Sequence, residues 1–105
     1  MKFYPLKITV IKKDFYKELV NEYVLNPEMI SVCHLVDEND EFLVTNPYVI
    51  PEKMCASAWA DIRPYIITMA TGGAFDFMKN PDTALAICSD PLRPVVFKIE
   101  RYDSW

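Results

Sequence analysis

The sequence predicts an α+β fold in which two helices cover one side of a mainly antiparallel sheet of four to five strands. Alternating and β-branched apolar residues indicate strands over residues 2–12, 84–87 and 95–99, with Pro5 near the start of the first strand or at a sheet edge. Apolar residues three or four apart indicate a long helix: Cys55, Ala58, Trp59, Ile62, Ile66 and Met69. Since 105 residues suit one core, we expect a single domain, residues 1–105.

A short helix is expected after the first strand. Asp14 is the predicted N-cap, and Phe15, Leu19 and Tyr23 then repeat at helical spacing. This helix should end before Pro27, because proline disfavours helix at the residue ahead of it.

A hairpin is expected between the two helices. Residues 30–36 and 41–45 have strand-like composition, and the polar segment 37–40 between them is typical of a turn.

The long helical pattern begins at Pro51 and should turn its Trp59 face inward. Pro64 lies inside the pattern, where it removes an N–H and crowds the carbonyl four residues earlier. We therefore expect a kink or a break into two helices near Arg63.

The two glycines of the chain, Gly72 and Gly73, directly follow this pattern. They suit a left-handed helix C-cap, and a backbone nest that binds an anion is the alternative. Residues 75–82 are expected to form an irregular connection to two final strands.

Composition narrows the possible partners and the compartment. A net charge of −4 disfavours nucleic acid and anionic membranes as partners, and no apolar run is long enough to span a membrane. The three cysteines, Cys33, Cys55 and Cys88, are odd in number and far apart, which is unlike a disulfide framework. These features, together with the lack of a signal-like N-terminus, predict free thiols and a cytoplasmic location.

The most reactive segment runs from Cys88 to Pro94, between the last two predicted strands. Asp90 before proline favours a turn, and Pro94 restricts Arg93 to an extended conformation. One interpretation is a hairpin connection with a surface ion pair. The other is a pocket in which Arg93 binds a carboxylate by a two-point contact.

Other side chains extend this candidate site. Cys88 is the candidate nucleophile or redox thiol, with Asp61 or Asp90 as acid or base and Cys55 nearby. His34 is the only histidine, and is either a general base or a structural residue. Further candidate ligand-binding residues, including those for an apolar wall, are Tyr65, Trp59, Phe75, Gly72 and Gly73.

Parts of the sequence resemble a family of small uncharacterised prokaryotic proteins. Members tend to carry a Trp-Ala-Asp-Ile helix, a Gly-Gly pair and a Cys-x-Asp-Gly-x-Arg-Pro-Val-x-Phe-Lys ending, and the likeness spans residues 7–101. Members often have cysteines where Cys33, Cys55 and Cys88 stand. The chain departs from the family at Ile87, where relatives have a second cysteine, and at Pro91, where they have glycine. The family has no assigned activity, so the resemblance indicates related proteins but does not predict a function.

Three hypotheses about function follow. The leading one is a cytoplasmic domain that binds a small anionic molecule, with or without cysteine chemistry, so whether it is an enzyme stays open and no cofactor is identified. The second is a structural or accessory subunit whose exposed apolar residues form a homo-oligomer or partner interface. The third is a metal or iron–sulfur site formed by Cys33, Cys55 and Cys88, with His34 as a further ligand.

Overall fold

The computed structural model describes residues 2–102 and contains one antiparallel sheet of four strands in the order β2-β1-β4-β3. The strands are β1 (Leu6–Lys13), β2 (Glu41–Val44), β3 (Thr83–Ile87) and β4 (Val95–Arg101). The helices are α1 (Lys17–Tyr23), the short 3-10 helix η1 (Pro27–Met29) and α2 (Ala56–Ala70). The predicted α+β class is confirmed, and the strand count is the lower of the two expected.

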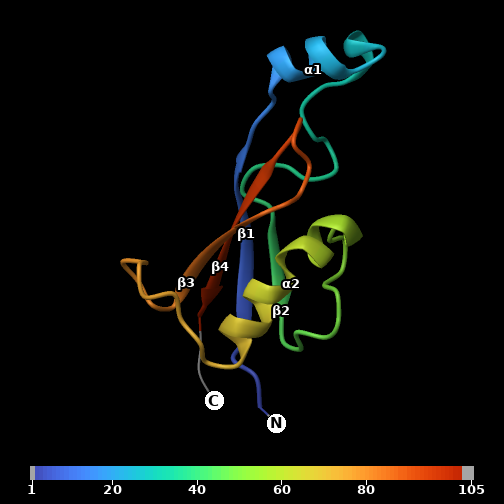
Figure 1. Cartoon of the computed structure of the whole chain (residues 1–105). Helices are drawn as coiled ribbons and strands as arrows, with labels where there is room; N and C mark the ends of the chain where they lie inside the picture. Colours follow the sequence, from blue (N-terminus) through green and yellow to red (C-terminus); the bar gives the residue numbers. More distant parts are fainter. Residues whose placement is uncertain (1, 103–105) are drawn as a thin grey trace.

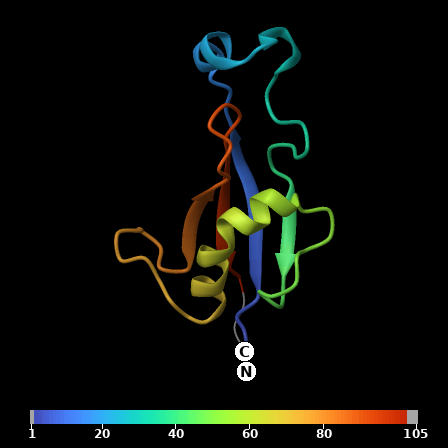
Figure 2. The same ribbon diagram turned by 45° about the vertical axis from the view of Figure 1, so that its right-hand side comes forward.

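The two helices have different positions relative to the sheet. Helix α2 lies across one face and packs against β1, β3 and β4, whereas α1 lies beyond the ends of the strands (Figures 1 and 2). The molecule measures 50 × 30 × 20 Å, and α1 with η1 forms the far end of its long axis (Figure 1). No helix within residues 2–102 has both the length and the apolar character needed to cross a bilayer.

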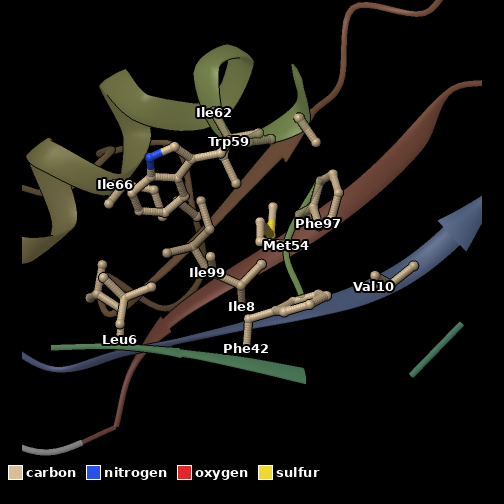
Figure 3. Packing of buried hydrophobic residues seen from close by; sticks show 14 of the residues in the cluster. Leu6, Ile8, Val10, Phe42, Met54, Trp59, Ile62, Ile66, Phe97 and Ile99 are labelled. Carbon is tan, nitrogen blue, oxygen red and sulfur yellow. The ribbon is translucent and has the colours of Figure 1, made fainter. Parts of the chain in front are cut away.

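The core lies between α2 and the inner face of the sheet (Figure 3). Alternation along β1 turns Leu6, Ile8 and Val10 inward, and the antiparallel register places Ile99 of β4 opposite Ile8. Helix α2 contributes six buried residues, Ala58, Trp59, Ile62, Ile66, Met69 and Ala70. Trp59 is only 7% exposed, so the predicted inward face of this helix is confirmed.

A one-residue bulge changes which way the end of β1 faces. Val10 pairs with Phe97 of β4, but Lys12 pairs with Val96, so Ile11 is the extra residue. Without the bulge Lys12 would face inward. With it, Lys13 pairs with the buried Val95 and shares its face.

The predicted hairpin between residues 30–36 and 41–45 is wrong. Residues 30–36 form no strand, and β2 pairs with β1 instead. The turn at residues 37–40 does form, and Asn39 adopts a positive φ of 74° there. The N–H of Asn39 donates to the carbonyl of Val10 (2.7 Å), so the turn leads the chain to β1 rather than back on itself.

Helix α1 also differs from its prediction. Its N-cap is Tyr16 and not Asp14, whose carboxylate accepts a hydrogen bond from the neighbouring N–H of Phe15 (2.8 Å). Of the apolar residues at helical spacing only Val20 is buried in α1, and Tyr23 is 78% exposed. The pattern predicted a helix correctly, but this helix has no sheet to cover.

Helix α2 begins after its N-cap Cys55, later than the predicted start at Pro51. It runs through Pro64 without a break. Pro64 lies on the exposed side of the helix, where water can bond the carbonyl that proline leaves free. Of the two expected outcomes at this proline, the break into two helices is therefore wrong.

The glycine pair ends α2 as a helix cap. Gly72 has a φ of +94°, its N–H donates to Met69, and the N–H of Gly73 donates to Thr68 (2.8 Å). This pair of bonds is a Schellman motif, so the predicted left-handed C-cap is confirmed. The side chain of Arg101 reinforces this end by donating to the carbonyls of Met69 and Gly73.

The inward position of Trp59 can be tested by shortening its side chain. We expect Trp59→Ala to lower the free energy of unfolding by about 3–5 kcal/mol, because a buried aromatic is replaced by a cavity. Urea denaturation followed by circular dichroism measures the change. Leu43→Ala is the control, since this side chain is 61% exposed and its loss should change the free energy by about 0.5 kcal/mol or less. Equal losses of unfolding free energy for the two variants would contradict the inward packing of Trp59.

Candidate functional site

A cavity of about 380 Å³ lies beside the N-terminal end of α2. Its lining brings together residues from four parts of the chain that are distant in sequence. Among them are Cys33, Cys55, Asp61, Cys88, Asp90 and Arg93. Cys55, Cys88, both carboxylates and the guanidinium of the predicted anion site therefore share one cavity. Cys33, which was predicted only as a metal ligand, lines it as well, and all three cysteines are free.

Secondary structure fixes the position of most of these groups. Cys55 is the N-cap of α2, and Asp61 follows it within the same helix. Cys88 directly follows β3, and Val95 and Phe97 of β4 provide an apolar wall. Asp90 and Arg93 belong to the turn between β3 and β4, and Cys33 comes from the irregular segment between η1 and β2.

Asp90 organises the turn between β3 and β4. One carboxylate oxygen accepts hydrogen bonds from the N–H groups of Leu92 (2.9 Å) and Arg93 (3.1 Å). The other accepts one from Nε of Arg93 (3.0 Å). Burial alone would raise the pKa of Asp90, but these bonds and the charge of Arg93 together hold it below its ordinary value. The turn predicted from Asp90 before proline is therefore present, and so is the ion pair of the structural interpretation.

The ion pair leaves most of the guanidinium free. Within the described part of the chain, no group accepts a hydrogen bond from either terminal nitrogen of Arg93. Arg93 thus lines the cavity while Asp90 holds it through Nε alone. A planar guanidinium fixed in this way still has donors for an oxyanion.

Two further bonds join the turn to the rest of the site. The N–H of Ser89 donates to the carboxylate of Asp61 (2.7 Å), which links the turn to α2. Asp61 pairs with neither Arg63 nor Arg93, the partners considered from the sequence. Cys88 forms a two-way pair with Val95: its N–H donates to the carbonyl (3.1 Å), and its Sγ accepts the N–H of Val95 (3.3 Å).

Lys13 is a site residue that the sequence did not reveal. Its Nζ donates to the carbonyls of Cys33 and Val36 (both 2.8 Å) and lies 3.8 Å from a carboxylate oxygen of Asp37. It therefore holds the segment that carries Cys33 against the sheet. The only signal for it is the bulge at Ile11, which depends on strand pairing and cannot be recognised from local sequence.

The N-terminal end of α2 adds positive potential to the cavity. Cys55 makes no side-chain cap hydrogen bond, and Ser57 and Ala58 of the first turn also line the cavity. The first N–H groups of a helix have no partner inside it, and the helix dipole makes this end partly positive. The helix end and Arg93 together favour an anion in this cavity.

The other predicted site residues lie elsewhere. His34 is exposed and does not line the cavity, although its neighbours Cys33 and Leu35 do. Tyr65 stacks on Phe75 with ring centroids 5.3 Å apart, and neither lines the cavity. Trp59 belongs to the core rather than to an apolar wall of the site. Gly72 and Gly73 cap the opposite end of α2.

The cysteines do not form a recognisable metal centre in this structure. Within residues 2–102, no group of three or more histidine, cysteine, aspartate or glutamate side chains has the arrangement needed to hold a metal ion. The three cysteines line one cavity and also pack against the hydrophobic core.

Comparisons of the chain with family models, curated proteins and solved structures find no match. The resemblance to a prokaryotic family therefore stays a prediction. The site must be interpreted from its own geometry.

The role of Asp90 predicts a specific pH dependence. A carboxylate with a lowered pKa in the folded protein stabilises it above the ordinary aspartate pKa, about 3.9, and this contribution is lost as pH falls through the folded value. We expect Asp90→Asn to cost about 1 kcal/mol near neutral pH and progressively less below about pH 4.

Thermal denaturation from acid to neutral pH measures this difference. Asparagine keeps an oxygen that can accept the turn N–H bonds, so the variant removes mainly the charge. Asp76→Asn is the control, because Asp76 is exposed and forms no ion pair within residues 2–102. If the difference in stability between wild type and Asp90→Asn stayed constant with pH, the proposed role of the Asp90 charge would be ruled out.

Proposed function

We propose that this protein binds a small anionic molecule in the cavity beside the N-terminal end of α2. The observation that supports this most strongly is the coincidence of two anion-attracting features at one cavity. Arg93 has terminal donors free, and the first turn of α2 has no capping side chain.

The size and lining of the cavity narrow the class of ligand. A volume of about 380 Å³ is at the small end of the range for ligand pockets, about 300–1,000 Å³. Two carboxylates also line it, but the N–H of Ser89 bonds Asp61, and the turn and Arg93 surround Asp90. Because hydrogen-bond donors of the protein already contact both carboxylates, the terminal donors of Arg93 stay available for the ligand. The ligand is therefore a small carboxylate or phosphate with an apolar part that contacts Val95 and Phe97.

The free thiols favour a reducing compartment, and we infer that the protein works in the cytoplasm. Three partly buried thiols at an anion-binding cavity also suit a ligand that reacts with sulfur. In that case Cys88 is the reacting group, and Asp61, which accepts the N–H of the neighbouring Ser89, or Asp90 is the acid or base.

Anion binding can be tested on the isotope-labelled protein by NMR titration with propionate and with inorganic phosphate. We expect amide shifts to concentrate at Ser57, Ser89 and Arg93. Arg93→Lys should weaken binding by about tenfold or more, since lysine keeps the charge but loses the two-pronged geometry. Folding should be nearly unchanged, because a half-exposed ion pair contributes about 0–1 kcal/mol.

Lys98→Gln is the matched control for this titration. It removes one positive charge that is paired with Glu100 (3.4 Å) on the outer face of the sheet. Weaker binding in Lys98→Gln together with unchanged binding in Arg93→Lys, or shifts that avoid the cavity, would show that the anions bind only through overall charge.

A second candidate function is supported by the end of the molecule that α1 and η1 form. Tyr23, Leu25 and Met29 are 78%, 92% and 77% exposed there, although isolated domains seldom expose so many large apolar side chains together. We propose that this end is an interface with a second copy of the chain.

Light scattering after size-exclusion chromatography tests the interface. We expect the wild type to elute as a dimer, and Leu25→Asp to shift it to a monomer, because a buried aspartate without a partner is costly. Leu85→Asp, on the outer face of the sheet, is the control and should not change the mass. A monomeric wild type at all concentrations would exclude this interface.

A further inference from the structure

The cavity is lined both by the proposed anion-binding residue, Arg93, and by a cysteine, Cys88, whose sulfur already accepts a hydrogen bond. Cys88 is the one cysteine in residues 2–102 whose Sγ has a hydrogen-bond partner, the N–H of Val95 (3.3 Å). An N–H donor aimed at sulfur stabilises a developing thiolate more than a neutral thiol, because hydrogen bonds to charged groups are stronger. The donor is a backbone group held by the pairing of Cys88 with Val95, so it is in place before any ligand arrives.

Arg93 lies on the wall of the same cavity and belongs to the same turn. Asp90 fixes the guanidinium through Nε, so its free end has a restricted direction. A ligand whose carboxylate binds this end lies in a cavity that Cys33, Cys55 and Cys88 also line. Tight binding of the carboxylate raises the local concentration of the group that follows it.

We infer that Cys88 exchanges with small disulfides that carry a carboxylate, and that Arg93 selects them by charge. This inference rests on the proposed anion site and adds a reaction to it. The Cys88 thiolate attacks one sulfur of the substrate. The substrate S–S bond breaks, a new S–S bond forms between Cys88 and that half, and the other half leaves as a thiolate that takes up a proton. The thiol of Cys88 and one disulfide thus give one mixed disulfide and one free thiol, and no outside oxidant is needed.

Three disulfides of similar length test the selection by charge: dithiodipropionate carries two carboxylates, hydroxyethyl disulfide is neutral, and cystamine carries two ammonium groups. The double variant Cys33→Ser with Cys55→Ser leaves Cys88 as the only thiol, so mass spectrometry over time gives the rate of its first step. Each rate is divided by the rate of a free cysteine peptide with the same disulfide, because the three leaving thiols differ in reactivity.

We expect the normalised rate with dithiodipropionate to exceed that with hydroxyethyl disulfide by about tenfold, with cystamine the slowest. When Arg93→Gln is added to the double variant, this preference for the carboxylate over the neutral disulfide should disappear. Equal normalised rates for the three probes, or a preference that survives Arg93→Gln, would overturn the inference.

A second measurement needs no substitution. The wild-type protein is alkylated briefly with iodoacetate or with iodoacetamide, which differ by a carboxylate against an amide, and the modified cysteine is mapped after digestion. Modification of Cys88 with a relative preference for iodoacetate, compared with the same free peptide, supports the inference. First modification of Cys33 or Cys55 by both reagents contradicts it.

The anion site itself is tested separately with Cys88→Ser, which cannot exchange. If this variant binds propionate but Cys88 shows no preference for carboxylate disulfides, the exchange reaction is wrong and the anion site stands. If propionate does not bind to Cys88→Ser or to the wild type, both proposals fail.

Discussion

The packing of α2 across the inner face of the sheet, against β1, β3 and β4, is the constraint on which the candidate site depends. Ile62 and Ile66 are fully buried against strand residues such as Ile8 and Ile99, so the helix has little freedom to slide or rotate. Its N-terminal end is thereby held beside the β3–β4 turn, where the carboxylate of Asp61 meets the N–H of Ser89. The opposite end is fixed independently, by the glycine cap and by Arg101. The candidate site is thus a product of core packing, because the core decides which loop the helix end faces.

The walls of the cavity are held by hydrogen bonds, some of which are local and some of which join residues distant in sequence. Asp90 shapes its own turn by local bonds, whereas Asp61 reaches a turn 28 residues away. Lys13 supports the wall that contains Cys33. It reaches the Cys33 carbonyl only because the extra residue at Ile11 turns the Lys13 side chain inward. Since the segment around Cys33 has no strand pairing of its own, this wall depends most on a single side chain.

Features governed by local chemistry could be predicted from the sequence. The Asp90 turn, the left-handed Gly72 and the buried Trp59 face each follow from a few neighbouring residues, and the structure contains all three. The strand expected over residues 30–36 failed because strand-like composition does not reveal whether a partner strand is within reach. The convergence of Cys55 and Cys88 was expected. The approach of Cys33 was expected only under the metal hypothesis, and the role of Lys13 was not expected, since both depend on the register between β1 and β4.

That register also bears on how the chain folds. The two central strands, β1 and β4, come from opposite ends of the sequence, and Leu6 pairs with Arg101. During synthesis β1 therefore has only β2 as a partner until β4 leaves the ribosome, and the apolar wall formed by Val95 and Phe97 is missing until then. Sheets closed by such distant contacts form slowly, because a long loop must be ordered before its contacts are gained. The three cysteines therefore share a finished cavity only after β4 has paired, although Cys33 and Cys55 precede β4 in the sequence.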